Sequence, residues 1–313
     1  MSGPAGDGRD RGGSGGDSAR DLDAFEACRP ALLALAYRML GDLARAEDLV
    51  QEGWIRWSRG GAQVEAPAAY LWRTVTHLCL NELASARARR EESRGDRLPE
   101  PIDLTRGGLD RVEALDRLSM AFLVLLQRLT AAERAVLLLH DVFDFSHADI
   151  GSMLGKSEAA CRQLLRRARD HVAADRRAMS ASHDEHRRLL AAFVRAAAAG
   201  EVEELVALLA EDAELIADAG PAGGRFGRVR NLPGPVRGRA RVAAFVAAVT
   251  PQGSRDLEAR ECELNGQPAV LVLRGGRPYT AILLAVADGL IHRVFIHADP
   301  DRLSHVAPSQ SIV

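Results

Sequence analysis

The sequence predicts a multidomain chain in which two all-helical domains precede an α+β domain with a curved antiparallel sheet. Apolar residues recur at threes and fours over residues 21–90 and again over 109–178, which is the period of amphipathic helices. Runs typical of strands occur only after residue 268. Helices followed by antiparallel strands indicate an α+β domain at the end of the chain. The 313 residues agree with two or three domains of about 100–200 residues each.

The composition excludes several classes of protein. Forty-one basic and 43 acidic residues give a formal net charge of −2, so any DNA contact must be local. No run of about 18 apolar residues exists, and the N-terminus is rich in Gly, Asp and Arg, so we expect a cytoplasmic protein without membrane contact. The sequence has four cysteines, which lie far apart and form no CxxC pair: Cys28, Cys79, Cys161 and Cys262. No histidines cluster at metal spacing either, so we expect no disulfide, metal or cofactor.

The first helical domain is expected over residues 21–90. Residues 1–20 contain seven glycines and no Leu, Ile, Val or Phe, which predicts a disordered tail. One helix should end at Gly41, a second should cover 42–59, and a third should cover 68–90 after Pro67. The second helix carries an apolar stripe beside a polar stripe formed by Glu47, Asp48, Gln51 and Glu52. One face therefore belongs to the core and the other is available.

A linker and a second helical domain follow. Residues 91–108 hold two prolines, charges and glycines without a hydrophobic period, which predicts the linker. The second domain is expected over 109–178, with helix starts at Thr130, Ser146 and Ser157 and a tight turn at Gly155. This order predicts a helix-turn-helix. The final helix places arginines together on an outward face: Arg162, Arg166 and Arg169.

The α+β domain is expected over residues 183–306. A helix over 183–199 ends at Gly200, a short helix reaches Ala210, and another helix covers 239–249. Strands are expected over 269–273, 279–287 and 290–296. Asp288 and Gly289 between two apolar runs predict a hairpin.

The segments AYRMLGDLARAEDLVQEGWIRW (36–57) and LTAAERAVLLLHDVFDFSHADIGSMLGKSEAACRQLLRRARDHV (129–172) resemble regions two and four of extracytoplasmic-function (ECF) RNA polymerase sigma factors. Residues 183–306 resemble the SnoaL-like fold, and sigma factors fused to such a domain carry a linker similar to Leu98-Pro99-Glu100-Pro101. The resemblance implies an alternative sigma factor that binds core RNA polymerase and starts transcription at promoters.

The resemblance also implies binding surfaces for core polymerase and promoter DNA. The stripe on the second helix corresponds to the surface that docks on the clamp helices of the polymerase β′ subunit: Glu47, Asp48, Gln51, Glu52 and Trp54. The third helix corresponds to the part that reads the −10 element: Trp72, Arg73, Asn81, Arg87 and Arg89. The last helix of the helix-turn-helix corresponds to the part that reads the −35 element: Ser157, Glu158, Ala160, Arg162, Gln163 and Arg166.

Each surface has a plainer interpretation from the residues alone. The polar stripe can be a solvated helix face, Trp72 can be a core residue beside a basic helix end, and a helix-turn-helix can be two packed helices. His77 departs from the common pattern of the third helix, where many members have Asn or Arg.

Two motifs of the C-terminal domain resemble segments that touch the sigma core and regulate it in fused sigma factors. One begins at Asp218 and is interrupted relative to the family pattern, and the other is Asp299-Pro300-Asp301-Arg302-Leu303. With the linker residues Leu98, Pro99, Glu100 and Pro101, they imply an intramolecular contact between the C-terminal domain and the sigma domains. The domain would then modulate activity in place of a separate anti-sigma protein.

The alternative is a bifunctional or ligand-sensing protein whose SnoaL-like pocket binds or converts a small molecule. The groups available for acid–base chemistry are His292, His297, Asp218 and Tyr279, and no pair has a spacing that dictates such geometry. On one strand, His292 and His297 point to opposite faces unless a bulge intervenes. A lone histidine on a strand is usually structural, so we expect no catalytic residue and no enzyme activity.

Overall fold

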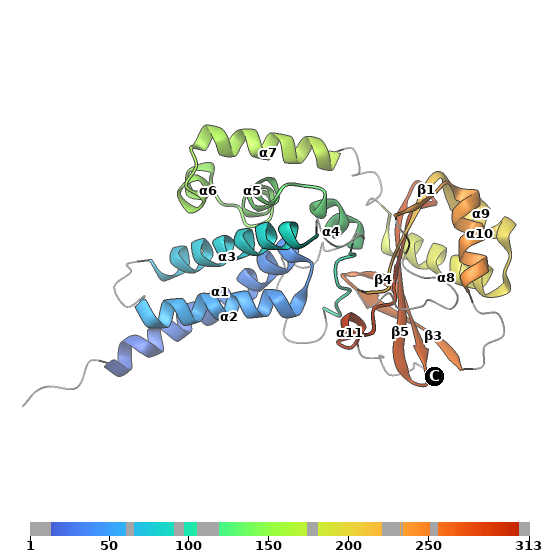
Figure 1. The fold of residues 1–313 in the computed structure, drawn as a ribbon, viewed down its shortest axis with the longest axis horizontal. Helices are drawn as coiled ribbons and strands as arrows, with labels where there is room; N and C mark the ends of the chain where they lie inside the picture. Colours follow the sequence, from blue (N-terminus) through green and yellow to red (C-terminus); the bar gives the residue numbers. More distant parts are fainter. Residues whose placement is uncertain are drawn as a thin grey trace, which may run out of the picture.

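The computed structural model describes residues 14–60, 66–90, 97–104, 119–173, 181–220, 232, 234–250 and 256–306. Figure 1 shows two sets of helices at one end of an elongated molecule and a sheet with its own helices at the other end. Helices α4 and α11 lie between the two ends. The predicted fold class is therefore confirmed.

The first helical domain consists of α1 (Ser14–Leu40), α2 (Leu43–Gly60) and α3 (Pro67–Arg90). Gly41 ends α1 as predicted: its φ is +70°, and its amide donates to the Tyr37 carbonyl at 2.7 Å. The prediction of a disordered tail over residues 1–20 is wrong for its last residues, because α1 begins at Ser14. A helix that is nucleated by a packed segment adds one backbone hydrogen bond per residue, so it extends into a sequence without apolar residues.

The second helical domain consists of α4 (Met120–Gln127), α5 (Ala131–Asp141), α6 (His147–Leu154) and α7 (Glu158–Ala173). The predicted start signals are confirmed, because Thr130 and Ser146 each close a capping box and the Ser157 hydroxyl accepts from the Ala160 amide at 3.2 Å. Gly155 adopts the left-handed conformation between α6 and α7. The expected beginning at Leu109 and the expected end near Arg177 lie outside the described residues.

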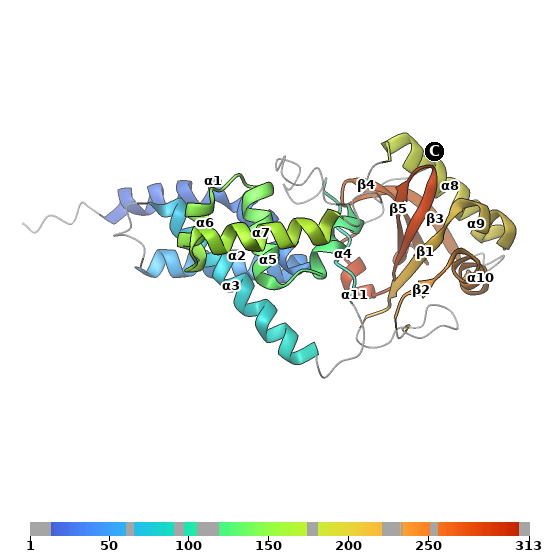
Figure 2. The same ribbon diagram turned by 90° about the horizontal axis from the view of Figure 1, so that it is seen from above.

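The two helical domains share one apolar core. Phe25, Tyr37, Trp57 and Leu71 of the first domain belong to the same buried cluster as residues of α5, α6 and α7: Val136, Leu138, Ile150 and Leu165. Figure 2 shows α5, α6 and α7 lying over α1, α2 and α3. Burial of this shared surface holds the two domains side by side.

Within the described residues, the C-terminal domain has six strands and four helices. The helices are α8 (His183–Ala199), α9 (Val202–Leu208), α10 (Arg239–Val249) and α11 (Pro300–Leu303). The strands are β1 (Leu209–Asp218), β2 (Val236–Arg237), β3 (Leu257–Leu264), β4 (Gln267–Arg274), β5 (Arg277–Ala287) and β6 (Leu290–His297). Their order is β2-β1-β6-β5-β4-β3, and all pairs are antiparallel except β1 with β6, which is parallel.

The sequence missed three of these strands. The short helix expected to reach Ala210 ends at Leu208, and β1 follows without a loop. The ladder of β1 with β6 is irregular between Leu209 and Glu214, so β1 lacks a clean alternation of apolar and polar residues. Strand β2 has two residues, and β3 lies at the sheet edge with mostly solvated side chains. The hairpin at Asp288 and Gly289 is confirmed, because both residues have positive φ between β5 and β6.

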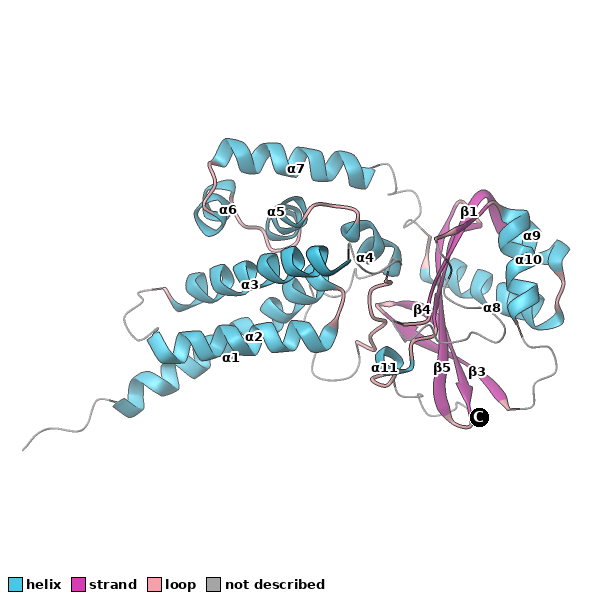
Figure 3. Cartoon of the chain, in the orientation of Figure 1, coloured by secondary structure: helices cyan, strands magenta, loops and turns pink. Residues whose placement is uncertain are grey.

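Both faces of the sheet carry buried side chains. Figure 3 shows that different elements lie on the two sides of the sheet. Helices α8, α9 and α10 cover one face through Leu190, Phe193 and Val242. The other face, with Leu271, Leu283 and Phe295, belongs to a cluster contributed partly by other parts of the chain: Leu98, Met120, Ala121 and Val124. The C-terminal domain therefore packs directly on the segment 97–104 and on α4.

The close approach of Gly41 to Pro99 is testable by substitution. Gly41 and Gly155 both have positive φ, so an alanine at either position costs about 1–2 kcal/mol in backbone strain. A Cβ atom at Gly41 would also lie 3.3 Å from Pro99, whereas one at Gly155 would meet nothing within 4 Å. We therefore expect Gly41→Ala to lower the free energy of unfolding, measured in urea, by more than Gly155→Ala does. Equal losses would contradict a tight contact with Pro99.

Candidate functional site

The polar stripe of α2 is open to solvent. Glu47, Asp48 and Gln51 are exposed, and Glu52 is half-buried and pairs with Arg56 at 2.8 Å. Trp54 packs on the Phe25 ring of α1, with centroids 4.8 Å apart. The stripe is thus an accessible acidic surface bordered by an aromatic side chain.

Helix α3 contacts the second helical domain through its predicted aromatic residue. The Trp72 ring packs edge-on against Phe143 and Phe145, with both centroid distances 4.9 Å. His77 adds a hydrogen bond, because its Nε2 donates to the Met153 carbonyl of α6 at 2.7 Å. The loop after α5 and helix α6 therefore cover part of α3.

The other predicted residues of α3 are placed differently. Arg73 and Asn81 are exposed. The side chains of Arg87 and Arg89 lie outside the described part of the chain. Among the described side chains of this set, Trp72 is the one held against the second helical domain.

The predicted surface of α7 faces solvent. Ala160 is half-buried. The other five residues are exposed: Ser157, Glu158, Arg162, Gln163 and Arg166. Arg162 pairs with Glu158 at 2.8 Å, whereas the Arg166 guanidinium is 85% exposed and lies 4.0 Å from Asp170. The opposite side of the helix is core, because Cys161, Leu165, Ala168 and Val172 are buried.

Arg169 is exposed but has a structural partner. It binds Asp141 in a two-pronged contact, with nitrogen–oxygen distances of 2.6 and 3.1 Å. Burial raises the pKa of Asp141, but the hydrogen bonds from Arg169 and His140 outweigh it and hold that pKa below its usual value. Arg169 thus fixes α7 against the end of α5.

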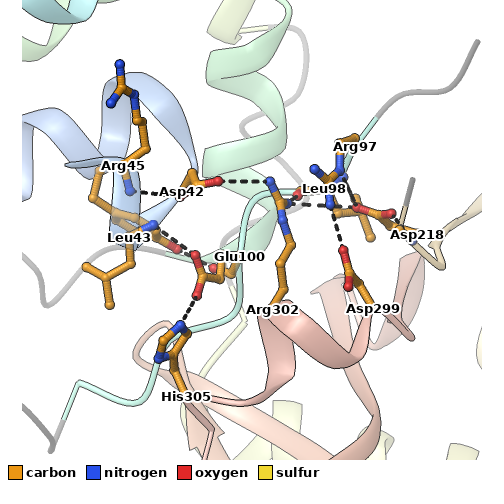
Figure 4. A network of polar contacts seen from close by, with 12 residues as sticks. Asp42, Leu43, Arg45, Arg97, Leu98, Glu100, Asp218, Asp299, Arg302 and His305 are labelled. Atoms are coloured by element: carbon orange, nitrogen blue, oxygen red, sulfur yellow. Dashed lines mark hydrogen bonds and ion pairs between the residues drawn. The ribbon is translucent and has the colours of Figure 1, made fainter. Parts of the chain in front are cut away.

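The segment Leu98-Pro99-Glu100-Pro101 is buried between the first helical domain and the C-terminal domain (Figure 4). The Leu98 amide donates to Asp218 Oδ2 at 3.0 Å, and the Leu98 carbonyl accepts from Arg302. The Glu100 amide donates to the Gly41 carbonyl at 2.8 Å, and the Glu100 carboxylate accepts from the Leu43 amide at 2.8 Å. Glu100 therefore caps the beginning of α2 from the linker.

Charged groups from three parts of the chain surround this segment. Arg97 Nη2 lies 2.6 Å from Asp299 Oδ2, and Arg302 lies 3.5 Å from Asp42 of the first domain and 3.9 Å from Asp218. Figure 4 shows Arg302 reaching from α11 toward Asp42 and Leu98. Burial raises the pKa of Glu100, which lies 4.0 Å from His305. The network ties the first helical domain, the linker and the C-terminal domain together.

Most predicted contact residues of the two C-terminal motifs meet at this junction. Asp218, Asp299 and Leu303 are buried there, whereas Pro300 and Asp301 are exposed in the first turn of α11. Asp218 makes its contact although its motif is interrupted; residues 221–231 lie outside the described residues.

Sequence reasoning missed several partners, because nothing local marks them. Asp42 and Arg97 resemble any surface charge, and Tyr37 belongs to an apolar helix stripe. Gln267 links α4 to the sheet: its Oε1 accepts from the Met120 amide at 2.9 Å, and its Nε2 donates to the Leu284 carbonyl at 3.0 Å. Asn265 and Gly266 form an Asn-Gly pair, a hairpin signal that was available in the sequence.

The candidate acid–base residues of the C-terminal domain do not converge. His297 is buried on the face toward the junction, at the register position of Asp218. A bulge does interrupt β6, since Ile291 and Arg293 pair with neighbouring residues of β5. It displaces His292, whose Nδ1 lies 4.0 Å from Asp212. Tyr279 lies under the Arg274 guanidinium at 3.8 Å.

Within the described ranges, no group of three or more His, Cys, Asp and Glu side chains is arranged to hold a metal ion. Among the described helices, none is long and apolar enough to span a membrane.

Comparison with known proteins assigns the helical domains. The family model "Sigma-70 region 2" matches residues 24–89, and the model "Sigma-70, region 4" matches residues 119–172. These matches define the class of the protein as a sigma-70-type transcription factor with an additional C-terminal domain.

Relatives from Mycobacterium tuberculosis extend the match over nearly the whole chain. The ECF RNA polymerase sigma factor SigJ is 34% identical over 300 residues, covering 91% of this chain and 93% of that protein. The probable ECF RNA polymerase sigma factor SigI is 31% identical over 288 residues, covering 90% and 93%. The crystal structure of SigJ superposes with a TM-score of 0.68 at 28% identity, covering 92% of this chain and all of that one. The chain belongs to the ECF RNA polymerase sigma factors, a family that acts in transcription initiation, which confirms the resemblance.

The buried histidine at the junction predicts a dependence of stability on pH. Burial, with a further contribution from Arg302, lowers the pKa of His297 from 6.5 to about 3. Below pH 6.5, His297 therefore binds a proton in the unfolded chain but stays neutral in the folded chain down to about pH 3. The free energy of unfolding should fall by up to about 1.4 kcal/mol per pH unit between pH 6.5 and about 3, and the contribution is fully present above pH 6.5.

Urea unfolding at a series of pH values would measure this dependence. His297→Phe is the informative variant, since neither ring nitrogen of His297 has a hydrogen-bond partner within the described residues. The variant should lose part of the slope below pH 6.5 and keep its stability at pH 8. An unchanged slope would show that His297 does not carry the effect.

Proposed function

We propose that this chain is an alternative sigma factor that binds core RNA polymerase through α2, reads −35 DNA through α7 and reads −10 DNA through α3. Its C-terminal domain modulates this activity by holding the two sigma domains together. The polymerase carries out the chemistry, and the chain itself is not an enzyme.

The observation that carries the proposal is the surface of α7. In a helix-turn-helix, the second helix enters the major groove, and its N-terminal residues meet base edges. Helix α7 follows a tight turn, and Arg162, Gln163 and Arg166 are exposed along its first half. Arginine suits guanine edges and phosphates, and glutamine suits adenine. This supports −35 recognition by Ser157, Glu158, Ala160, Arg162, Gln163 and Arg166.

The acidic stripe of α2 supports the polymerase contact. Glu47, Asp48 and Gln51 remain exposed while the domain is packed on both of its neighbours. Acidic side chains on an accessible helix suit a basic partner surface and speed the encounter with it. Glu52 completes the stripe and Trp54 borders it, and the proposed partner is the pair of clamp helices of the β′ subunit.

The packing of the sigma domains supports a resting state. Elements centred near −35 and −10 are about 25 base pairs apart, roughly 85 Å of duplex at 3.4 Å per base pair. Helix α3 is in direct contact with α6 through His77 and Met153, so the two reading helices belong to one packed body. Trp72, a candidate for −10 contact with Arg73, Asn81, Arg87 and Arg89, is partly covered by Phe143 and Phe145. Initiation therefore requires the domains to separate.

The junction supports a regulatory role for the C-terminal domain. It binds the linker through Asp218 and Arg302, the first sigma domain through Arg302 and Asp42, and the second through Gln267 and Met120. A domain that binds all three parts at once resists their separation. The residues proposed to carry this contact are Leu98, Pro99, Glu100, Pro101, Asp218, Asp299, Arg302 and Leu303, with Pro300 and Asp301 shaping α11.

Run-off transcription tests the central proposal. The full-length chain is added to core polymerase on a library of promoter fragments, and transcripts are sequenced from their 5′ ends. We expect initiation at a subset that shares −35 and −10 sequences. Failure to initiate on every fragment would refute the sigma function.

Substitution of one arginine tests the −35 surface. If Arg166 reads a base, Arg166→Ala should weaken binding to a −35 duplex by about 1–3 kcal/mol. If Arg166 contacts a phosphate, the variant should reduce the slope of log affinity against log salt concentration by about one. Arg195→Ala is the matched control, because Arg195 is also exposed but lies on α8 of the C-terminal domain. Fluorescence anisotropy with labelled duplex, at several salt concentrations, measures both. Equal effects of the two variants would argue against the α7 surface.

Substitution at the junction tests the modulation. Arg302→Gln removes the ion pairs to Asp42 and Asp218 and disturbs the bond to the Leu98 carbonyl. Unpaired buried groups should weaken the packed arrangement by about 1–3 kcal/mol, so run-off transcription should rise several-fold. Arg241→Gln, at an exposed position of α10, should leave transcription unchanged. A rise in both variants, or in neither, would contradict control through the junction.

A further inference from the structure

The turn between β3 and β4 is buried in an unusual place for a hairpin. Asn265 and Gly266 have φ angles of +53° and +65°, as a two-residue hairpin turn requires. Turns of this kind normally lie in solvent. Asn265 is only 1% exposed, because the hairpin tip extends beyond its own sheet to the junction with the first sigma domain.

Asn265 bonds to two other parts of the chain at once. Its backbone amide donates to the Ile102 carbonyl at 2.8 Å, and its Oδ1 accepts from the Ile102 amide at 3.2 Å. Its Nδ2 donates to the Tyr37 hydroxyl of α1 at 2.8 Å. Asn265 therefore satisfies both backbone groups of Ile102 and also reaches α1 with its side chain.

The chain of bonds continues back to the linker. The Tyr37 hydroxyl donates to the Glu100 carbonyl at 2.5 Å. It thus accepts from Asn265 of the C-terminal domain and donates to the linker. Burial raises the pKa of Tyr37, which keeps the hydroxyl protonated and able to donate. The Asn265 carboxamide supplies both the acceptor for Ile102 and the donor for Tyr37, and an ionised aspartate would lack the donor.

We infer that the Asn265 turn is a neutral pin that holds residues 97–104 against α1, and that its withdrawal accompanies the opening of the sigma domains. This inference rests on the proposed function and goes beyond the predicted motifs. Arg97 is 41% exposed, so water can solvate part of that ion network when the junction loosens. The bonds of Asn265 are buried and uncharged, so each one lost leaves a buried group without a partner.

The two ends of the pin can be removed separately in the full-length chain. Asn265→Asp keeps a residue that suits the turn and an acceptor for Ile102, and it removes the donor to Tyr37. Tyr37→Phe removes only the hydroxyl. The matched control is Asp288→Asn, since Asp288 and Gly289 form a second turn with φ of +52° and +74° at an exposed position.

Hydrogen exchange of peptides covering residues 97–104 reports the pin directly, and run-off transcription with core polymerase reports its consequence. We expect Asn265→Asp and Tyr37→Phe each to raise exchange there roughly tenfold and to raise transcription. The double variant should add little to Tyr37→Phe, because Tyr37→Phe already removes the Asn265–Tyr37 bond together with the bond to the Glu100 carbonyl. Asp288→Asn should match the wild type in both measurements.

The outcomes separate the inference from the proposed function. Unchanged exchange in Asn265→Asp and Tyr37→Phe overturns the pin, whatever transcription does. Raised exchange with unchanged transcription overturns the link between the pin and opening, provided the wild type initiates. If no form initiates, the sigma function fails, and exchange alone still decides whether Asn265 holds the segment.

Discussion

The structure depends on the burial of one extended segment, residues 97–104, between a helical bundle and a sheet. A buried backbone must place every N–H and C=O group with a partner. The backbone N–H and C=O groups of Leu98, Glu100 and Ile102 all have partners. Those of Leu98 and Ile102 lie in the C-terminal domain, and those of Glu100 are Gly41 and Tyr37 of the first helical domain. The residues between Leu98, Glu100 and Ile102 are Pro99 and Pro101, which have no N–H to satisfy. The proline spacing thus lets a segment without regular secondary structure be buried on both sides.

The same burial explains why the C-terminal domain cannot be regarded as a free appendage. Its own helices cover one face of the sheet, and the second face carries Leu271, Leu283 and Phe295 under Leu98 and Met120. A contiguous apolar face of this kind is rarely left in solvent. Separation of the domains would expose both this face and the apolar residues of the linker, so the packed arrangement is favoured until another surface replaces the cover.

The sequence predicted the features that residues close in the chain determine. It did not predict the contacts that depend on residues far apart in the chain. Helix starts at Thr130, Ser146 and Ser157 were predictable because a capping side chain bonds to a backbone amide three residues away. Strand β3 was missed, since an edge strand with Glu261 and Glu263 exposed on one side and Glu258 exposed on the other lacks apolar alternation. The linker motif and Arg302 were identified by resemblance, but their partners Asp42 and Tyr37 have no local signal. The contact of Trp72 with Phe143 depends on how two domains dock, which no spacing within either domain encodes.

The positions of the open and covered surfaces suggest an order of events under the proposed function. The acidic stripe of α2 and the arginine face of α7 are solvent-exposed in the packed arrangement, whereas Trp72 is held by the second sigma domain. Polymerase and −35 duplex can therefore engage before the domains separate. A ligand shifts such an equilibrium only by its differential affinity for the two states. Contact with −10 DNA supplies that difference, because α3 is fully accessible to DNA only after Phe143, Phe145 and α6 have moved away from it.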